Sequence, residues 1–177
     1  HGQHCHYFSS ATSDHDTPTT ADRMARYKQE SVPLASRAAR EAFADSEVNK
    51  DAITHLITVS CTGFFLPGVD VALMRQLGLP SHVNRIPLTF LGCAAGLSAI
   101  RIAREIVAGN PSAKVLIVSV ELCTLHVQAS YEREDLFAAA FFGDGAAACI
   151  IGEAHASAQR SSIFVLGNNH TVIFSGT

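Results

Sequence analysis

Blocks of apolar positions along the chain predict both strands and helices. Short runs that are apolar throughout are typical of buried strands, whereas apolar residues spaced by three and four are typical of helices that cover a sheet. The runs that predict strands are 54–60, 83–90, 114–120, 146–151 and 163–166. The segments that predict helices are 21–27, 34–43, 69–77, 93–108 and 132–142. Strands therefore alternate with helices over the middle of the chain.

This alternation favours an α/β fold. Between residues 54 and 120 the order is strand, helix, strand, helix, strand. Strands that are apolar throughout are covered on both faces, and helices between them connect neighbouring strands of one sheet. We therefore expect a mostly parallel or mixed sheet covered by helices.

Composition narrows the class of protein. The 177 residues are 47% hydrophobic and 16% charged, which is enough to build a core. The net charge is −3 and the basic residues are scattered, so no nucleic-acid surface is expected. No apolar run is long enough to span a bilayer, and the first residues lack the order of a secretion signal. We therefore expect a cytoplasmic protein.

The cysteines and histidines do not predict a metal site. The five cysteines are an odd number without a C-x-x-C pair, which fits reduced thiols better than disulfides or zinc. His1, His4 and His6 surround Cys5, but no acidic residue or second cluster at ligand spacing accompanies them. We expect no bound metal.

Cys93 is the first candidate for chemistry, because it lies where an apolar run gives way to a helical pattern. A thiol reacts as its thiolate, and the positive end of a helix favours that form. Gly92 and Gly96 flank the turn and allow a close approach of backbone or substrate. The structural alternative is a small core residue at the start of an Ala/Gly-rich helix.

Further loops follow apolar strands or helices, so in an α/β sheet they can gather with Cys93 at one edge. They are 61–68, 121–126 and 141–146. Gly143-Asp144-Gly145 supports a tight bend, and Phe141 and Phe142 can line an apolar pocket. An ordinary turn beside a core aromatic pair is the alternative for this segment.

Ordered motifs in these loops resemble the type III polyketide synthases, which are chalcone-synthase-like enzymes of the thiolase fold. The motifs are 54–57, 61–63, 66–70, 92–96, 120–126 and 142–148. The resemblance implies that Cys93 accepts the acyl group, that Phe142 separates the CoA tunnel from the elongation cavity, and that Leu66 reaches across a homodimer interface. The positions that it places on the cavity wall are Cys61, Cys123, His126 and Ala138.

The implied reaction joins an acyl-CoA starter to malonyl-CoA through a cysteine thioester, with CoA thioesters as substrates and no resident cofactor. Plant chalcone synthases have threonine at the positions of Cys61 and Cys123. Cysteine there is more similar to bacterial enzymes that extend long acyl chains to alkylpyrones or alkylresorcinols.

The resemblance also implies that this chain is incomplete. The family's chain is about twice as long, and its catalytic histidine and asparagine lie in the second half of a duplicated fold. His126 and His170 do not match that histidine, and 171–177 resembles the start of a strand without a closing element. We expect residues 1–177 to form an incomplete, thiolase-like N-terminal catalytic domain that lacks the C-terminal half and full activity.

Other functions stay open at this point. An initiating β-ketoacyl carrier-protein synthase shares the fold, the helix-start cysteine and a motif similar to 142–146. The motifs 61–63, 66–70 and 121–126 favour the polyketide family over it. A non-catalytic half-domain that binds acyl-CoA or another subunit is the alternative from a different class.

Overall fold

One mixed sheet organises the protein. The structure, a computed structural model, describes residues 18–46, 48–127, 130, 132–153, 164–168, 170 and 172. The sheet has the order β2-β1-β3-β4. Its strands are β1 (His55–Ser60), β2 (Asn84–Thr89), β3 (Lys114–Leu122) and β4 (Asp144–Gly152).

The pairing of the strands sets where the loops meet. β1 lies between β2 and β3 and is parallel to both, whereas β4 is antiparallel to β3. Because β1, β2 and β3 run in the same direction, the loops that follow them leave from one edge of the sheet. The predicted mixed sheet is confirmed, and with it the predicted origin of the candidate loops.

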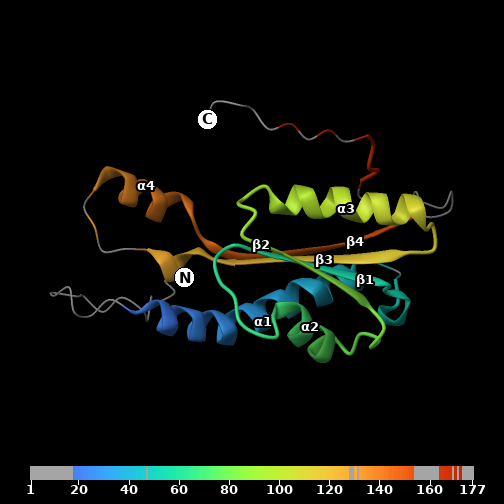
Figure 1. Cartoon of the computed structure of the whole chain (residues 1–177), viewed down its shortest axis with the longest axis horizontal. Helices are drawn as coiled ribbons and strands as arrows, with labels where there is room; N and C mark the ends of the chain where they lie inside the picture. Colours follow the sequence, from blue (N-terminus) through green and yellow to red (C-terminus); the bar gives the residue numbers. More distant parts are fainter. Residues whose placement is uncertain are drawn as a thin grey trace.

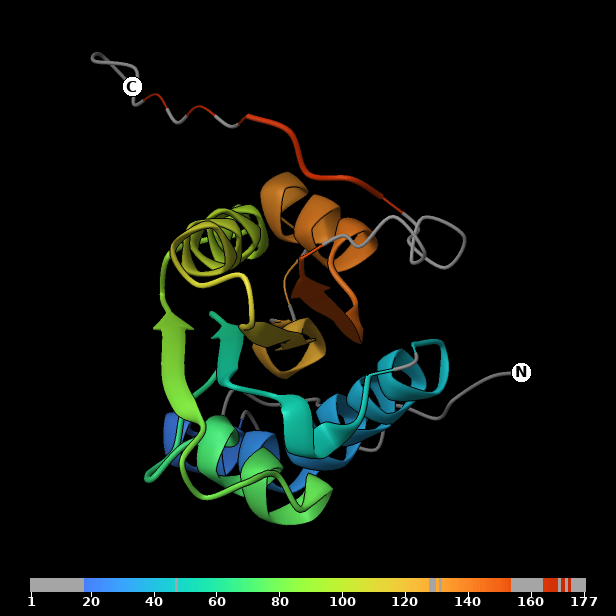
Figure 2. The same ribbon diagram turned by 90° about the vertical axis from the view of Figure 1, so that its right-hand side faces the viewer.

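Helices cover both faces of the sheet (Figure 1). In that view α3 (Ala95–Gly109) lies above the sheet, and α1 (Thr20–Ala44) and α2 (Val69–Leu77) lie below it. Figure 2 shows the same layers from the side, with α4 (Arg133–Phe141) on the same side of the sheet as α3. The short 3-10 helices are η2 (Lys50–Ala52) and η3 (Cys123–His126).

Alternate residues of the strands fill two apolar cores. Leu56 and Leu116 are fully buried in the core between the sheet and the helices α1 and α2, with Ala35 of α1. Ile57 and Val115 are buried in the core against α3, together with Ala99. The small alanines of α1 and α3 let both helices lie close to the sheet.

The N-terminal helical region differs from the prediction of two separate helices. α1 is one helix of 25 residues that continues through Pro33. Proline removes one backbone donor and usually breaks a helix. Here Tyr27, Ser31, Ala35 and Ala39 form a single buried stripe at intervals of four residues, so packing on the sheet stabilises both halves together.

Smaller differences concern element ends. α3 begins at Ala95 rather than Cys93, and β4 begins at Asp144 rather than Ala146. The predicted strand 163–166 is wrong over Phe164–Leu166, which carry no strand, and Ile163 lies outside the described residues. Of the segment 171–177, only Val172 is described. No helix in the described ranges is long and apolar enough to cross a membrane.

Replacing a core leucine tests this packing. Leu116 is fully buried, whereas Leu97 on α3 is 72% exposed. We expect Leu116→Ala to lower the free energy of unfolding by about 2–5 kcal/mol, because it leaves a cavity under α1. Leu97→Ala is the matched control and should change it by less than about 0.5 kcal/mol. Equal losses in urea denaturation of the two variants would contradict the assignment of the core.

Candidate active site

The turn that carries Cys93 has an unusual backbone. Phe90 has a φ of 58° and Gly92 a φ of 77°. Glycine adopts this region freely, but for phenylalanine it costs about 1–2 kcal/mol. Gly92 is needed for its conformation, since a Cβ atom there would meet nothing within 4 Å. The turn leaves Cys93 exposed, two residues before α3 begins.

Contacts with the neighbouring loop hold this strained turn. The Phe90 N–H donates to the Ser60 carbonyl at 3.3 Å. The ring of Phe90 meets that of Phe64 edge to face, with 5.9 Å between the ring centroids. The turn that carries Cys93 is therefore attached to the end of β1, where the Cys61 loop begins.

The carboxylate of Glu121 joins the ends of β1 and β3. It accepts hydrogen bonds from the Cys61 N–H at 3.0 Å, the Thr62 N–H at 3.0 Å and the Thr62 hydroxyl at 2.6 Å. The Cys61 thiol donates to the same carboxylate, with Sγ 3.6 Å from Oε1. Hydrogen bonds to an ionised acceptor are the strong ones, so this group fixes the Cys61 loop.

Thr62 extends the connection to η3. Its Oγ1 also accepts from the Leu122 N–H at 2.8 Å, and its carbonyl accepts from Nε2 of His126. Because a carbonyl only accepts, Nε2 of His126 is the donor in this bond. Cys61 and His126 are thus brought to one surface by a shared neighbour.

Tyr27 supports the same loop from below. Its hydroxyl donates to Oγ of Ser60 at 2.6 Å, and Ser60 in turn donates to Glu121 at 3.4 Å. Burial raises the pKa of Tyr27, so the phenol stays neutral as the donor of this chain of hydrogen bonds. The ring packs against Gly63, where an added Cβ would lie 2.3 Å from a ring carbon. Gly63 is therefore required for the close approach of α1 to the loop.

The predicted thiols meet at this edge of the sheet. Cys61 and Cys123 are half-buried, and Cys93 is exposed. Burial and the Glu121 carboxylate raise the pKa of Cys61 to about 11. The pKa of Cys123 is also raised, by burial first and then by the charges of Glu121 and Asp144. At neutral pH Cys61 and Cys123 are therefore neutral thiols close to Cys93.

The segment around Gly143-Asp144-Gly145 is attached to η3, next to Cys123. The Asp144 carboxylate accepts from the N–H and the hydroxyl of Thr124 at 2.8 and 2.6 Å, which ties the start of β4 to η3. The segment is thus more than an ordinary turn. Phe142 and Ala138 lie on the neighbouring α4 and its end, and both are exposed. The structure brings neither into a described contact with Cys93.

Leu66 lines a small cavity that shares Tyr27, Gly63 and Phe90 with this site. This cavity of about 260 Å³ lies between the 61–68 loop, β1 and β2, and Tyr27, Phe65 and Phe90 are among its lining residues. Leu66 itself is 86% exposed. Asp70, which is buried, accepts from Arg85 at 2.8 Å and fixes the far end of the loop to β2.

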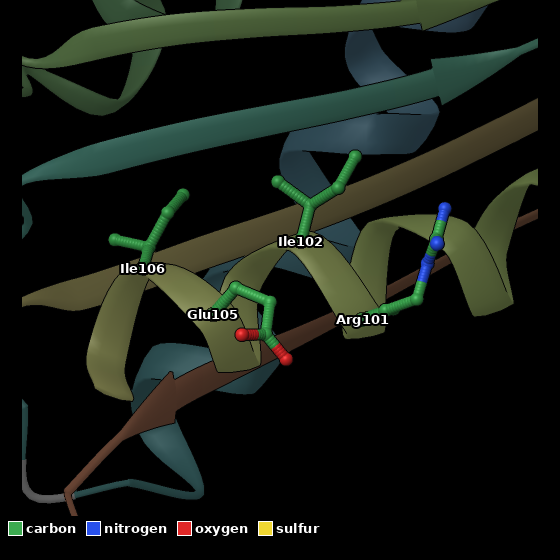
Figure 3. A pocket seen from close by; sticks show the side chains of 4 residues that line it. All are labelled: Arg101, Ile102, Glu105 and Ile106. Carbon is green, nitrogen blue, oxygen red and sulfur yellow. The ribbon is translucent and has the colours of Figure 1, made fainter. Parts of the chain in front are cut away.

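A second cavity lies on α3 and is lined by none of the described thiols. Figure 3 shows it on α3, where Arg101, Ile102, Glu105 and Ile106 line about 590 Å³. Over the described part of the chain, no group of three or more His, Cys, Asp or Glu side chains is arranged to hold a metal. His1, His4, His6 and Cys5 lie outside that part.

Comparison with known proteins decides the family. A model of the N-terminal domain of chalcone and stilbene synthases matches residues 9–155. The chain belongs to this family. The mixed sheet of this chain, with helices on both faces, has the thiolase-like fold of the type III polyketide synthases.

Relatives in the family carry polyketide synthase names. The chain is 37% identical to Alpha-pyrone synthesis polyketide synthase-like Pks18 of Mycobacterium tuberculosis, over 76% of this chain and 34% of Pks18. It is 33% identical to Acylalkylpyrone synthase csyB of Aspergillus oryzae, over 97% of this chain and 48% of csyB. The chain thus spans about a third to a half of the length of these relatives.

Solved structures agree with this family. The type III polyketide synthase domain of Steely1 from Dictyostelium has a TM-score of 0.72 at 36% identity, covering 75% of this chain and 36% of that one. The 1,3,6,8-tetrahydroxynaphthalene synthase of Streptomyces coelicolor has a TM-score of 0.72 at 34% identity, covering 76% and 39%.

The main residue that the sequence reasoning missed is Glu121. It lies in the motif 120–126, and the sequence alone assigns it no role. The signal was available, because a carboxylate at the end of an apolar strand needs buried donors. What the sequence did not show was the register of β3 against β1, which puts Glu121 beside Cys61.

Adding a side chain at Gly63 tests the close contact of this residue with the Tyr27 ring. We expect Gly63→Ala to lower the free energy of unfolding by about 1–3 kcal/mol, because the new methyl group overlaps the Tyr27 ring. Gly143→Ala is the control, since a Cβ there meets nothing within 4 Å, and it should change stability by less than about 1 kcal/mol. A Gly63→Ala protein as stable as the control in urea would disprove the close approach.

Proposed function

We propose that this chain carries the acyl-accepting site of a type III polyketide synthase, which condenses an acyl-CoA starter with malonyl-CoA. The observation that carries the proposal is the position of Cys93. It is an exposed thiol on a strained turn ahead of α3, facing a wall whose other thiols have raised pKa values. Strained turns of this kind occur at reactive groups, where they hold a nucleophile out of the regular structure.

The chemistry begins with transfer of the acyl group. The Cys93 thiolate attacks the thioester carbonyl of acyl-CoA, a new C–S bond forms, and the bond to CoA breaks so that CoA leaves as its thiolate. Decarboxylation of malonyl-CoA yields an enolate that attacks the acyl carbon and releases Cys93. We assign no described residue of this chain to the decarboxylation step.

The wall residues act on the growing chain by their shape and hydrogen bonds. Cys61 and Cys123 present small, soft groups, and Nε2 of His126 donates to the Thr62 carbonyl beside them. These features support the predicted preference for long acyl chains, because sulfur and methylene groups leave room where larger side chains would not. Phe142 and Ala138 stay predicted cavity residues.

We also propose that the full-length protein is a homodimer, because apolar side chains of the 61–68 loop are exposed. Leu66 and Phe64 are exposed on one loop, at 86% and 56% of their surfaces. Large apolar side chains exposed together are typical of interaction sites.

The cytoplasmic location, the absence of a resident cofactor and the absence of a nucleic-acid partner stay predictions from the sequence.

Membership of the chalcone and stilbene synthase family favours polyketide synthesis over a β-ketoacyl carrier-protein synthase. The full-length protein should therefore accept malonyl-CoA directly and extend more than once. Product analysis by liquid chromatography and mass spectrometry distinguishes the two. Strict dependence on an acyl carrier protein, with a single condensation, would contradict the proposal.

Substitution of the thiols tests the assignment of Cys93. We expect Cys93→Ala to lose all covalent acylation by a long-chain acyl-CoA, as measured from intact-protein mass. Cys123→Ala is the matched control. It should keep acylation and change the preferred chain length, because it alters only the wall. Acylation that persists in Cys93→Ala would show that another residue is the nucleophile, and binding without acylation in the parent chain would favour the non-catalytic alternative.

A further inference from the structure

We propose that Glu121 is a specificity-determining residue that selects Cys93 among the clustered thiols, by holding Cys61 as a neutral hydrogen-bond donor. The inference rests on the proposed function, because it concerns which thiol accepts the acyl group. It extends that function by giving Glu121 a chemical task beyond its structural one.

The geometry around Cys61 is the first argument. The Cys61 N–H donates to both oxygens of Glu121, to Oε1 at 3.0 Å and to Oε2 at 3.1 Å. The carboxylate therefore lies directly against the start of the loop. The Cys61 Sγ–H donates to Oε1 at 3.6 Å. A thiol that donates to a carboxylate must keep its proton, because a thiolate in the same place would face a second negative charge.

Among the described residues, the ionisable groups that act on the Cys61 thiol are acids, and none of them is a cation that could offset the charge of Glu121. These groups are Glu121 on β3, Cys93 before α3 and Cys123 on η3. The phenol of Tyr27 on α1 also lies within range of both Glu121 and Cys61, and it is neutral. Burial acts in the same direction and is the largest cause of the raised pKa of Cys61, about 11. Cys61 is therefore held protonated by two effects, of which Glu121 is the one that a single substitution can remove.

The consequence concerns the acyl group once it is on Cys93. A Cys61 thiolate could attack the Cys93 thioester carbonyl, form its own C–S bond and expel Cys93 as a thiolate. This exchange needs no other reactant, and it would move the acyl group to a wall position. With Cys61 protonated, the exchange is suppressed and the acyl group stays on Cys93.

Alkylation with iodoacetamide tests the inference without any CoA thioester. The rate of modification of each cysteine is measured between pH 7 and 11 by peptide mass spectrometry. In the parent chain, about 1 in 300 Cys61 thiols is ionised at pH 8.5, given a pKa of about 11. Cys61 should therefore react far more slowly than Cys93.

In Glu121→Gln we expect the rate at Cys61 to rise at least about threefold at pH 8.5, because the added charge repulsion is gone. Glu134→Gln is the matched control. It removes a carboxylate of the same size from the first turn of α4, and it should leave Cys61 unchanged. A second variant, Asp144→Asn, should raise the rate at Cys123 and not at Cys61.

Loss of folding is separated from loss of charge by Cys149, which lies on β4 away from Glu121. Unfolding would also raise the rate at Cys149, because burial raises the pKa of that thiol in the folded chain. Removal of the Glu121 charge raises the rates only at Cys61 and Cys123, the thiols on which this charge acts. An unchanged rate at Cys61 in Glu121→Gln, or a parent chain in which Cys61 reacts as fast as Cys93, would overturn the inference. Failure of Cys93 to accept an acyl group would instead overturn the proposed function and leave the alkylation result intact.

Discussion

The carboxylate of Glu121 is the interaction on which the site depends. Parallel pairing brings the ends of β1 and β3 side by side, but it does not by itself fix the loops that follow. Glu121 fixes the Cys61 loop, because it accepts hydrogen bonds from the N–H groups of Cys61 and Thr62 and from the hydroxyl of Thr62. One residue therefore supplies both the position of the loop and the negative charge beside its thiol.

The rest of the fold serves this arrangement from two sides. α1 brings Tyr27 beneath the loop, where its hydroxyl reaches Ser60 and its ring fills the space over Gly63. On the other face, α3 packs its alanines on the sheet and begins directly after the Cys93 turn. The Cys93 turn and the Cys61 loop therefore lead into different elements, and they are joined by the contact of Phe90 with the end of β1.

Much of this could be predicted from the sequence. The apolar runs located β1 and β3, because buried parallel strands are apolar throughout, and the run 83–90 located β2, whose residues are exposed or half-buried at the edge of the sheet. The motif around Cys93 predicted a thiol near the start of a helix, and Cys93 lies two residues before α3. The single helix α1 was missed because Pro33 is a strong local signal, whereas the stripe from Tyr27 to Ala39 that overrides it acts through tertiary packing. Glu121 was missed for a similar reason, since its partners are about 60 residues away in sequence and depend on strand register.

The central claim is that Cys93, and neither of its neighbours, accepts the acyl group. The direct measurement is the site of acylation after the parent chain is treated with a long-chain acyl-CoA and digested with trypsin. The thiols fall on separate peptides, 51–75 for Cys61, 86–101 for Cys93 and 115–133 for Cys123. We expect the acyl mass on 86–101 alone. The same mass on 51–75 or 115–133, with 86–101 unmodified, would contradict it.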